Sequence, residues 1–293
     1  MGDRMIELTR RIGAKDAGRK IKYYLRSDLK ISYHQYCAMK SAGGLKVNGA
    51  VVHADYLLQE GDVLTAALPD PGAAKAVEPE AGEICIPYRD GDLLIIDKRA
   101  PLACQCTPKQ PLGTLENRFA AQFDCPFRPL NRLDKGTSGL MAVALHPHSC
   151  QLLQRQLHTP AFVREYLAVV EGELTGEGTI DLPIAKDASA TVRRIVDHEN
   201  GQRALTHFRS EETNGRRSIL RLRLETGRTH QIRVHLAALS HPIVGDFLYG
   251  RETDELPGRF ALHSTRIQLD QPLTGARIDI SSPLPEELRR LMK

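Results

Sequence analysis

The sequence contains no run of about 18 apolar residues, which is the length that an α-helix needs to cross a membrane. Its first 11 residues are mixed and charged, and they lack the apolar stretch on which a secretory signal depends. Both absences argue against a membrane protein and against signal-directed secretion. We therefore expect a cytoplasmic protein with no membrane partner.

Paired cysteines and nucleotide-binding loops are also missing. The cysteines are scattered without a CxxC unit, so their spacing predicts neither a zinc site nor a disulfide framework. No glycine-rich nucleotide loop follows a strand-like segment, which argues against a nicotinamide, flavin or ATP site. We expect a protein without a metal ion, a nucleotide or any other cofactor. The six cysteines are Cys37, Cys85, Cys104, Cys106, Cys125 and Cys150.

Size and charge indicate two domains of different character. A chain of 293 residues, 41% of them hydrophobic, is long enough for two domains with buried cores. The net charge is only +4, but residues 1–68 hold 11 Lys and Arg against 7 Asp and Glu, so the whole excess lies there. Such a basic module fits contact with nucleic-acid phosphates, and a solvated helix surface fits the same charge.

A segment rich in proline, glycine and alanine divides the chain. It covers residues 71–82 and has no apolar period, which is typical of a connection between domains. We therefore predict a small module at 1–70, a linker at 71–82 and a larger domain at 83–293.

Local patterns predict two helices and a small sheet in the N-terminal module. Apolar spacing indicates a helix over 19–29, and Ser32 is placed to cap a second short helix. The Asn48-Gly49 pair predicts a hairpin turn within 45–52. A further strand is expected at 61–64.

The larger domain mixes strands and helices. Ser149 and Thr229 are placed to cap two helices. Leucines alternate with Arg221 and Arg223, which predicts a half-buried strand with a basic outer face. Strands are expected at 93–96, 140–145, 163–170 and 219–224.

The segment from Asn131 to Leu140 carries the residues best suited to chemistry. It has the sequence NRLDKGTSGL and places Asp134 between two basic neighbours, ahead of a Gly/Thr/Ser loop and an apolar strand. A nearby cation can hold such a carboxylate in its ionised form, ready to act as a nucleophile or a base. An aspartate in a turn of this composition more often only forms the turn, so the residues alone leave both roles open.

This segment resembles the HRLDxxTSGL motif of the RluA-type RNA pseudouridine synthases, with Asn131 in place of the usual histidine. The resemblance extends from about Gly91 to the C-terminus. It implies an α+β catalytic domain with a large mixed, mainly antiparallel sheet flanked by helices. Further motifs follow in the family's order: REYLAVVEG at 164–172, TGRTHQIRVH at 226–235, HPIVGD at 241–246, LYG at 248–250 and ALHS at 261–264.

The resemblance also implies an isomerisation of uridine, in which the base leaves its ribose carbon, turns and reattaches through carbon five. Asp134 would attack the ribose or remove a ribose proton. Tyr166 would stack on the base and help to remove the proton from carbon five, and Arg233 would pair with Asp134. From the residues alone, Tyr166 fits a core strand equally well and Arg233 fits a helix surface.

RNA contacts are expected from several basic residues. The resemblance associates Arg132 with opening the RNA around the target base. Arg228 and His230 are candidates for contact with phosphate or with the catalytic loop, and the basic face of Arg221 and Arg223 for contact with the RNA backbone. His230 and His235 are five residues apart, which is poor spacing for a shared metal ion on a helix.

The N-terminal module resembles the alpha-L RNA-binding module that is shared with a small-subunit ribosomal protein. Within it, Lys46 and Asn48 are the candidates for RNA contact, and Tyr33 and His34 stand where an arginine often follows the serine. The resemblance is carried by Ser32, Gly44, Val47-Asn48-Gly49 and Gly61-Asp62-Val63.

The sequence favours structured RNA as the partner and leaves its identity open. Large-subunit ribosomal RNA is our first expectation, because the alpha-L module often accompanies that specificity, and transfer RNA is the second. Two other classes stay open: a non-catalytic RNA-binding factor for ribosome assembly, and a hydrolase of glycosidic bonds. A hydrolase needs two carboxylates, and no second acid has a comparable motif. We expect a monomer.

Overall fold

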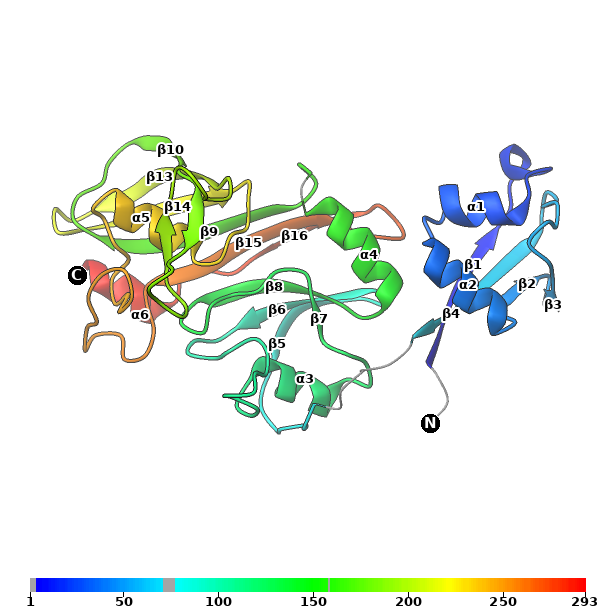
Figure 1. Cartoon of the computed structure of the whole chain (residues 1–293), viewed down its shortest axis with the longest axis horizontal. Helices are drawn as coiled ribbons and strands as arrows, with labels where there is room; N and C mark the ends of the chain where they lie inside the picture. The colour runs from blue at the N-terminus through cyan, green and yellow to red at the C-terminus, as the bar shows by residue number, and fades with distance from the viewer. Residues whose placement is uncertain (1–3, 71–76, 158) are drawn as a thin grey trace. The chain divides into compact units, whose positions relative to one another are not determined.

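The computed structural model describes residues 4–70, 77–157 and 159–293, which form two compact units (Figure 1). The first unit covers the N-terminal part as far as position 76, and nearly all of the remainder forms the second. Of the predicted linker, positions 71–76 lie outside the described residues. Positions 77–82 have no regular secondary structure, and there the Glu78 carbonyl accepts a hydrogen bond of 2.8 Å from the Asn117 amide of the second unit.

The N-terminal unit is a four-stranded antiparallel sheet with two helices. The strand order is β1-β4-β2-β3, and α2 packs on β4. The fully buried Ile21, Leu25, Met39 and Leu64 form its centre. Its elements are β1 (Arg4–Arg11), a 3₁₀ turn (Ala14–Asp16), α1 (Ile21–Ser27), α2 (Tyr33–Ser41), β2 (Leu45–Val47), β3 (Ala50–Val51) and β4 (Val63–Asp70).

Two local predictions are confirmed in this unit. Ser32 caps α2 through a capping box, since its hydroxyl accepts from the Gln35 amide at 3.2 Å and the Gln35 side chain accepts from the Ser32 amide at 3.0 Å. Asn48 and Gly49 have φ angles of 51° and 82°, the left-handed pair that a tight hairpin needs. Strand β1 was not expected. It lies at the edge of the sheet, and Leu8 is the only buried side chain among its described residues, so its sequence has little apolar pattern.

The second unit is built on a ten-stranded sheet. Its main path runs β10-β13-β14-β9-β15-β8-β6-β5, with β16 paired to β15 and β7 to β8. Every pair is antiparallel except β15 with β8, so the predicted mixed, mainly antiparallel sheet is confirmed. The strands are β5 (Cys85–Arg89), β6 (Leu93–Lys98), β7 (Arg128–Pro129), β8 (Ser138–Ala144), β9 (Val163–Glu171), β10 (Glu177–Asp181), β13 (Leu205–Thr213), β14 (Arg217–Leu224), β15 (Leu262–Asp270) and β16 (Arg277–Ser281).

Helices lie along this sheet and at its ends (Figure 1). A separate hairpin, β11 (Ile184–Lys186) with β12 (Arg194–Val196), stands off the main sheet. None of the described helices is long and apolar enough to cross a bilayer. The helices are α3 (Leu115–Gln122), α4 (Pro147–Gln156), α5 (Gln231–Ala238) and α6 (Glu286–Arg289), followed by a 3₁₀ turn (Arg290–Met292).

Both faces of the central strands are buried. Alternate residues of β6 and β8 enter two apolar clusters, with Ile96 and Met141 in one and Ile95 and Leu140 in the other. Side chains of a strand point alternately to opposite faces, so a strand covered on both sides has a continuous apolar sequence. This explains the uninterrupted hydrophobic run at 140–145.

The parallel junction between β8 and β15 depends on Gly139. Its φ is +106°, and a Cβ atom there would lie 2.3 Å from the backbone oxygen of Ser264. Only glycine allows this conformation and this approach. The junction sets Ser138 beside His263 in register, so the motif at 131–140 and the motif at 261–264 meet in space.

Two predicted helix starts are wrong. Helix α4 begins at Pro147, and the Ser149 hydroxyl donates to the carbonyl of Asp92 at 2.8 Å instead of capping the helix. Helix α5 begins at Gln231, and its N-cap is His230, with φ 58°, rather than Thr229. In both cases a contact distant in sequence or an unusual backbone angle overrides the local cap preference.

Candidate active site

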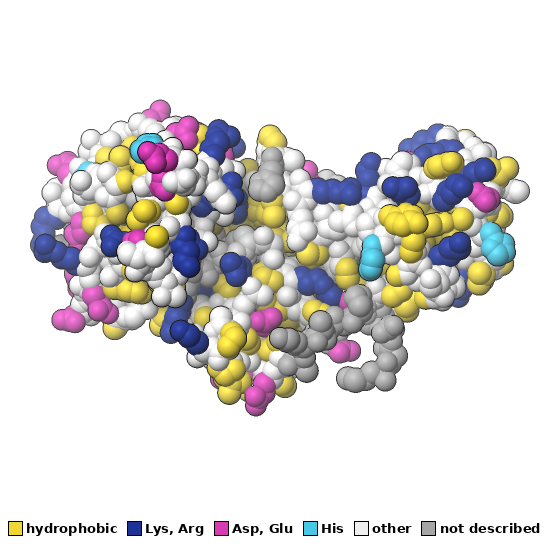
Figure 2. Space-filling model, in the orientation of Figure 1, with side chains coloured by type: hydrophobic (Ala, Val, Ile, Leu, Met, Phe, Trp, Pro, Cys, Tyr) yellow, Lys and Arg dark blue, Asp and Glu magenta, His cyan; other side chains and the backbone are white. Residues whose placement is uncertain are grey.

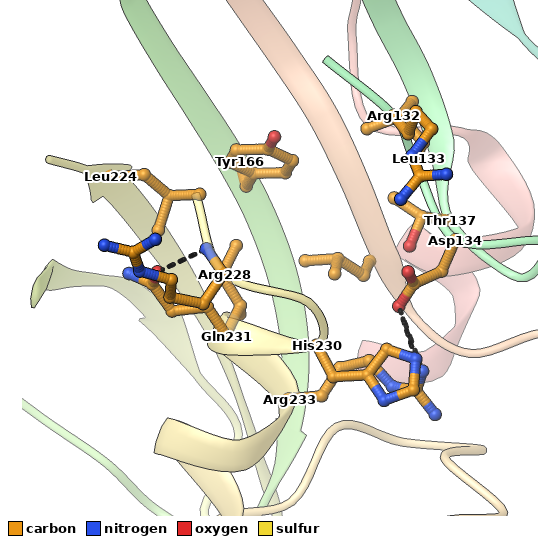
Figure 3. Close-up of a pocket in the computed structure, with 12 residues that line it drawn as sticks. Arg132, Leu133, Asp134, Thr137, Tyr166, Leu224, Arg228, His230, Gln231 and Arg233 are labelled. Atoms are coloured by element: carbon orange, nitrogen blue, oxygen red, sulfur yellow. Dashed lines mark hydrogen bonds and ion pairs between the residues drawn. The ribbon is translucent and has the colours of Figure 1, made fainter. Parts of the chain in front are cut away.

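A pocket of about 60 Å³ opens between the Asp134 loop, β9 and the start of α5 (Figure 3). It brings together the three residues implied for catalysis and three of the RNA-contact candidates, Arg132, Arg228 and His230. The pocket is lined by Arg132, Leu133, Asp134, Thr137, Tyr166, Leu224, Arg228, His230, Gln231, Ile232, Arg233 and Leu262.

Backbone hydrogen bonds hold the loop that carries Asp134. The Thr137 amide donates to the Asp134 carbonyl at 3.0 Å, which closes a tight turn, and the Leu102 amide donates to the Lys135 carbonyl at 3.0 Å. The ammonium of Lys98, which is only 1% exposed, donates to the Leu102 carbonyl at 2.8 Å. Burial lowers the pKa of Lys98 to about 8. These contacts fix the position of the Asp134 backbone.

Asp134 forms an ion pair with Arg233. Nη1 of Arg233 donates to Oδ2 of Asp134 at 2.9 Å, and the Asp134 side chain remains 29% exposed. The other edge of the guanidinium is bound twice by Asp246, through Nε at 2.7 Å and Nη2 at 2.8 Å. Asp246 therefore orients the guanidinium, and Asp134 receives one N–H while it still faces the pocket.

Arg233 is buried among aromatic rings. Its guanidinium carbon lies 4.2 Å from the ring centre of Phe260 and 5.0 Å from that of Tyr249. Burial alone disfavours its charge, but the hydrogen bonds and charges of Asp246 and Asp134 outweigh this effect, so the pKa of Arg233 is raised. Arg233 therefore keeps its positive charge beside Asp134.

His230 lies at the edge of the same pair. Its Nε2 is 3.7 Å from Oδ2 of Asp134, and its Nδ1 is 2.8 Å from the hydroxyl of Tyr249. The Tyr249 oxygen already accepts from the Arg194 amide, so its proton is available for Nδ1 of His230. Burial lowers the pKa of His230, against the opposing charge of Asp134, so the ring is neutral at pH 7.

Tyr166 forms a wall of the pocket from strand β9. It is 5% exposed, and burial raises the pKa of its phenol while the charge of Arg164 opposes the shift. The ordinary phenol pKa is already about 10, so this side chain is neutral at pH 7. Figure 3 shows the ring and Asp134 on different walls of one pocket.

The side chain of Gln231 organises the loop before α5. Its oxygen accepts from the Arg228 amide at 2.9 Å (Figure 3). The same oxygen accepts from the Thr226 hydroxyl at 2.8 Å. Its nitrogen donates to the Leu205 carbonyl at 3.0 Å. The loop that presents Arg228 and His230 to the pocket is thus tied to the sheet.

Other candidate RNA contacts lie away from this pocket. Arg221 pairs with Glu165 at 3.2 Å and with Glu211 at 2.5 Å in a different groove. Arg223 is exposed on β14.

The two candidates of the N-terminal unit differ in how their polar atoms are used. Asn48 donates to Asp62 at 2.9 Å and accepts from the Val63 amide at 2.8 Å, so its amide holds the hairpin. Lys46 is exposed on β2.

Three positioning residues were not identified from the sequence: Lys98, Gln231 and Asp246. Gln231 and Asp246 lie inside quoted motifs, and their place there was the available signal. Lys98 ends a strand of ordinary composition, and nothing local marks it as a buried ammonium. Among residues 4–70, 77–157 and 159–293, no three His, Cys, Asp or Glu side chains gather closely enough to hold a metal ion.

Comparison with known proteins adds to this geometry. A family model described as RNA pseudouridylate synthase matches residues 92–238. The chain is 37% identical to the uncharacterized RNA pseudouridine synthase YhcT of Bacillus subtilis, across 96% of this chain and 95% of the relative. It is 36% identical to ribosomal large subunit pseudouridine synthase D of Escherichia coli, across 74% of this chain and 72% of the relative. The solved structure of human RNA pseudouridylate synthase domain containing 1 matches with a TM-score of 0.58 and 27% identity, over 72% of this chain and 86% of that chain.

Proposed function

The chain belongs to the RluA-type RNA pseudouridine synthases, and from this membership we propose that it isomerises uridines in large-subunit ribosomal RNA with Asp134 as its central catalytic group. The enzyme class, an isomerase that forms pseudouridine in RNA, follows from the family. The choice of ribosomal RNA is supported by the Escherichia coli relative, whose name assigns it to the large ribosomal subunit. Transfer RNA is the second candidate.

The observation that carries the assignment of Asp134 is its ion pair with Arg233 inside a pocket shared with Tyr166. A carboxylate that is oriented by a guanidinium and partly exposed can act on the ribose of a bound uridine. It does so either by attacking the ribose carbon or by removing a ribose proton. Arg233 holds the carboxylate in place through its hydrogen bond.

Tyr166 is proposed to receive the detached base. In the isomerisation, the bond from the ribose carbon to N1 breaks, a bond to carbon five forms, the proton on carbon five leaves, and N1 takes up a proton. A neutral aromatic ring offers a face on which the base can stack while it turns. The phenol group lies in the same pocket and can help to pass that proton.

Arg132, Arg228 and His230 are proposed to contact RNA at the pocket mouth. Arg132 and Arg228 are exposed, and each has a guanidinium suited to phosphate. A base stacked within RNA must leave its helix before chemistry, which costs a few kcal/mol. We expect Arg132, two residues before Asp134, to occupy the space that the base vacates.

The N-terminal unit is proposed to add RNA affinity as an alpha-L module. Figure 2 shows Lys and Arg side chains on its visible face together with apolar ones. Tyr23 and Tyr33 are 59% and 67% exposed, and a cation lies over each ring, Lys22 at 5.4 Å and Arg26 at 5.9 Å. Exposed aromatic rings beside cations are suited to unpaired nucleotides. Its predicted cytoplasmic setting would give access to ribosomal RNA.

The decisive experiment compares the wild type with Asp134→Asn on an unmodified transcript of large-subunit ribosomal RNA. We expect the substitution to lower pseudouridine formation by at least about 10²–10⁴-fold, because the neutral amide can neither attack nor accept a proton. Asp279→Asn, which removes an exposed aspartate of the same unit, is the matched control and should retain activity. Unchanged product formation by Asp134→Asn would remove this mechanism.

The same assay separates the rival functions. Release of free uracil would indicate the hydrolase, and binding without any product from the wild type would indicate a non-catalytic factor. Mapping pseudouridines in ribosomal and transfer RNA from cells that lack the protein identifies the target. Loss of a site in transfer RNA alone would replace the ribosomal assignment.

A further inference from the structure

A second and larger cavity adjoins the catalytic pocket. Its volume is about 530 Å³, and it shares Arg132, Tyr166, Leu224 and Arg228 with the smaller pocket. Cavities of roughly 300–1,000 Å³ are typical of ligand sites. Three of its described lining residues are arginines, and none is an aspartate or a glutamate. The cavity is therefore positively charged.

Arg164, which lines this cavity, differs from the other buried arginines. It is 7% exposed, its Nε has no hydrogen-bond partner, and none of the described carboxylates pairs with it. By contrast, the buried Arg233 and Arg259 each form an ion pair with a carboxylate. A buried charge without a counter-ion is costly, so an unpaired arginine beside a cavity indicates an anion supplied from outside.

The surroundings of Arg164 leave its other nitrogen atoms room for a ligand. A Cβ atom at Gly227 would lie 3.0 Å from Nη1 of Arg164, so the glycine keeps this side open. On another side, the ring centre of Phe162 is 5.6 Å from the guanidinium carbon. Arg164 is thus supported by an aromatic ring and left accessible beside Gly227.

Asn131 lines the same cavity and also has an unpaired polar atom. Its oxygen accepts from the Ala142 amide at 3.2 Å, but its buried Nδ2 has no hydrogen-bond partner. This is the position at which the resembling motif usually has histidine. Neither residue adds a negative charge to the cavity, and Arg164 adds a positive one, which favours an anionic ligand over a neutral base.

We propose that this cavity binds a backbone phosphate of the RNA, next to the uridine that reaches Asp134, with Arg164 as its principal ligand. This inference rests on the proposed function. Because the two cavities share four wall residues, a nucleotide with its ribose at Asp134 has its neighbouring backbone at the larger cavity. The planar guanidinium is suited to bind two phosphate oxygens at once.

The test measures binding of an unmodified large-subunit ribosomal RNA transcript at several salt concentrations. We expect Arg164→Met to weaken binding by about 10-fold or more, as for a lost charge-assisted hydrogen bond. The slope of log affinity against log salt should become shallower by about 0.7, the value for one phosphate of a single strand. Arg164→Lys should retain the slope, because it keeps the charge. Arg290→Met, at an exposed arginine of the last 3₁₀ turn, is the charge-matched control, and its affinity and slope should equal those of the wild type.

Unchanged affinity and slope in Arg164→Met would overturn the proposal. So would a lower kcat with an unchanged slope, since Arg164 would then act on the reaction through Tyr166. Should thermal melting show that Arg164→Met does not fold, Asn131→Asp decides, because a new negative charge in the wall must weaken RNA binding if a phosphate lies there.

Failure of this proposal and failure of the proposed function give different results. Binding does not require turnover, so a wild type that binds the transcript without forming pseudouridine contradicts the function alone. A wild type that forms pseudouridine, with an Arg164→Met variant that binds RNA normally, contradicts the phosphate site alone.

Discussion

The guanidinium of Arg233 serves two carboxylates of unlike exposure. The side chain of Asp246 is fully buried and takes two hydrogen bonds, whereas that of Asp134 is 29% exposed and takes one. Since the buried partner sets the geometry, the exposed partner can meet a substrate without losing its cation. Asp246 also accepts from the Leu248 amide at 3.0 Å, so it joins the arginine to the loop that follows.

Replacing Asp246 by Asn should destabilise the protein strongly. The buried guanidinium of Arg233 would lose its paired charge and face an amide, and breaking a buried pair typically costs about 3–5 kcal/mol. Urea denaturation gives the free energy of unfolding. In the exposed pair of Arg266 and Asp279, Asp279→Asn should cost only about 1 kcal/mol or less. An equal decrease in the free energy of unfolding of the two variants would contradict the predicted role of Asp246.

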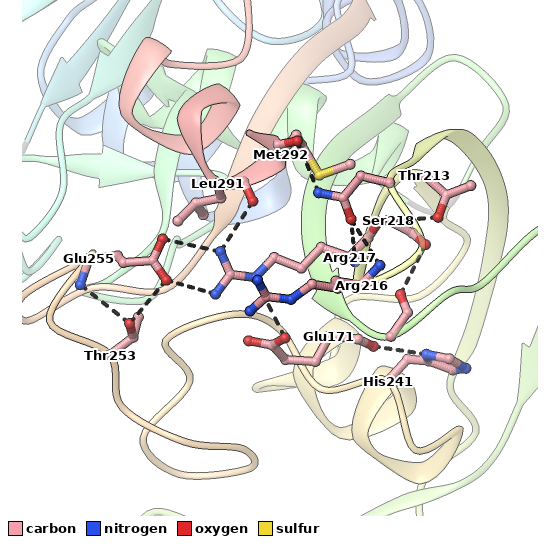
Figure 4. Close-up of polar contacts among 12 residues, drawn as sticks. Glu171, Thr213, Arg216, Arg217, Ser218, His241, Thr253, Glu255, Leu291 and Met292 are labelled. Carbon is pink, nitrogen blue, oxygen red and sulfur yellow. Dashed lines mark hydrogen bonds and ion pairs between the residues drawn. The ribbon is translucent and has the colours of Figure 1, made fainter.

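Strand β14 holds the C-terminal segment through one side chain. Arg217 donates to the Leu291 carbonyl at 3.1 Å and pairs with Glu255 at 2.7 Å, and Glu171 lies 3.6 Å from its Nε (Figure 4). The Asn214 amide of the adjoining turn donates to the Met292 carbonyl at 2.9 Å. These contacts satisfy carbonyl groups at a helix end that has no further turn to bond.

Arg217→Met should loosen the last residues without changing the catalytic pocket. We expect a loss of about 1–3 kcal/mol in unfolding free energy, because a buried carbonyl and Glu255 lose a charged donor. Limited proteolysis should then cut the C-terminal segment earlier. Arg216→Met is the matched neighbour, since Arg216 is exposed, and it should behave as the wild type. Identical proteolysis of both variants would contradict this anchoring.

Buried histidines connect distant parts of the second unit. His235 of α5 bonds to Thr206 at 2.9 Å and to the Leu182 carbonyl at 2.9 Å, and His263 of β15 bonds to Ser138 at 2.9 Å. Burial lowers the pKa of His230, His235 and His263 alike. The folded protein therefore favours the neutral form of all three rings.

The stability of the protein should fall as the pH decreases from 7.5 to 5.5. An unfolded histidine binds its proton near pH 6.5, while these three bind theirs at lower pH when folded. The unfolded state thus takes up more protons, and the free energy of unfolding decreases with falling pH. Urea denaturation at both pH values measures this change. His235→Gln should make the pH dependence shallower, and an unchanged dependence in that variant would contradict the role of this histidine.

Features that depend on neighbouring residues could be predicted from the sequence. The Ser32 cap, the Asn48-Gly49 turn and the alternation at 219–224 depend on residues close in the chain, so the pattern predicts them directly. The ordered motifs identified the family and, with it, the mixed sheet. For Asp134 the residues alone left two roles open, and the turn that they predict does exist.

Ion pairs between residues distant in sequence could not be predicted, because they depend on which distant segments the sheet brings together. Arg233 and Asp134 are 99 residues apart, and the residues alone placed that arginine on a helix surface, although it is 3% exposed. Lys98 and the partners of Arg221 were likewise determined by packing. The sequence shows which residues carry opposite charges and could pair. Only the tertiary structure decides which of them do, because a buried charge needs its partner within a few ångströms.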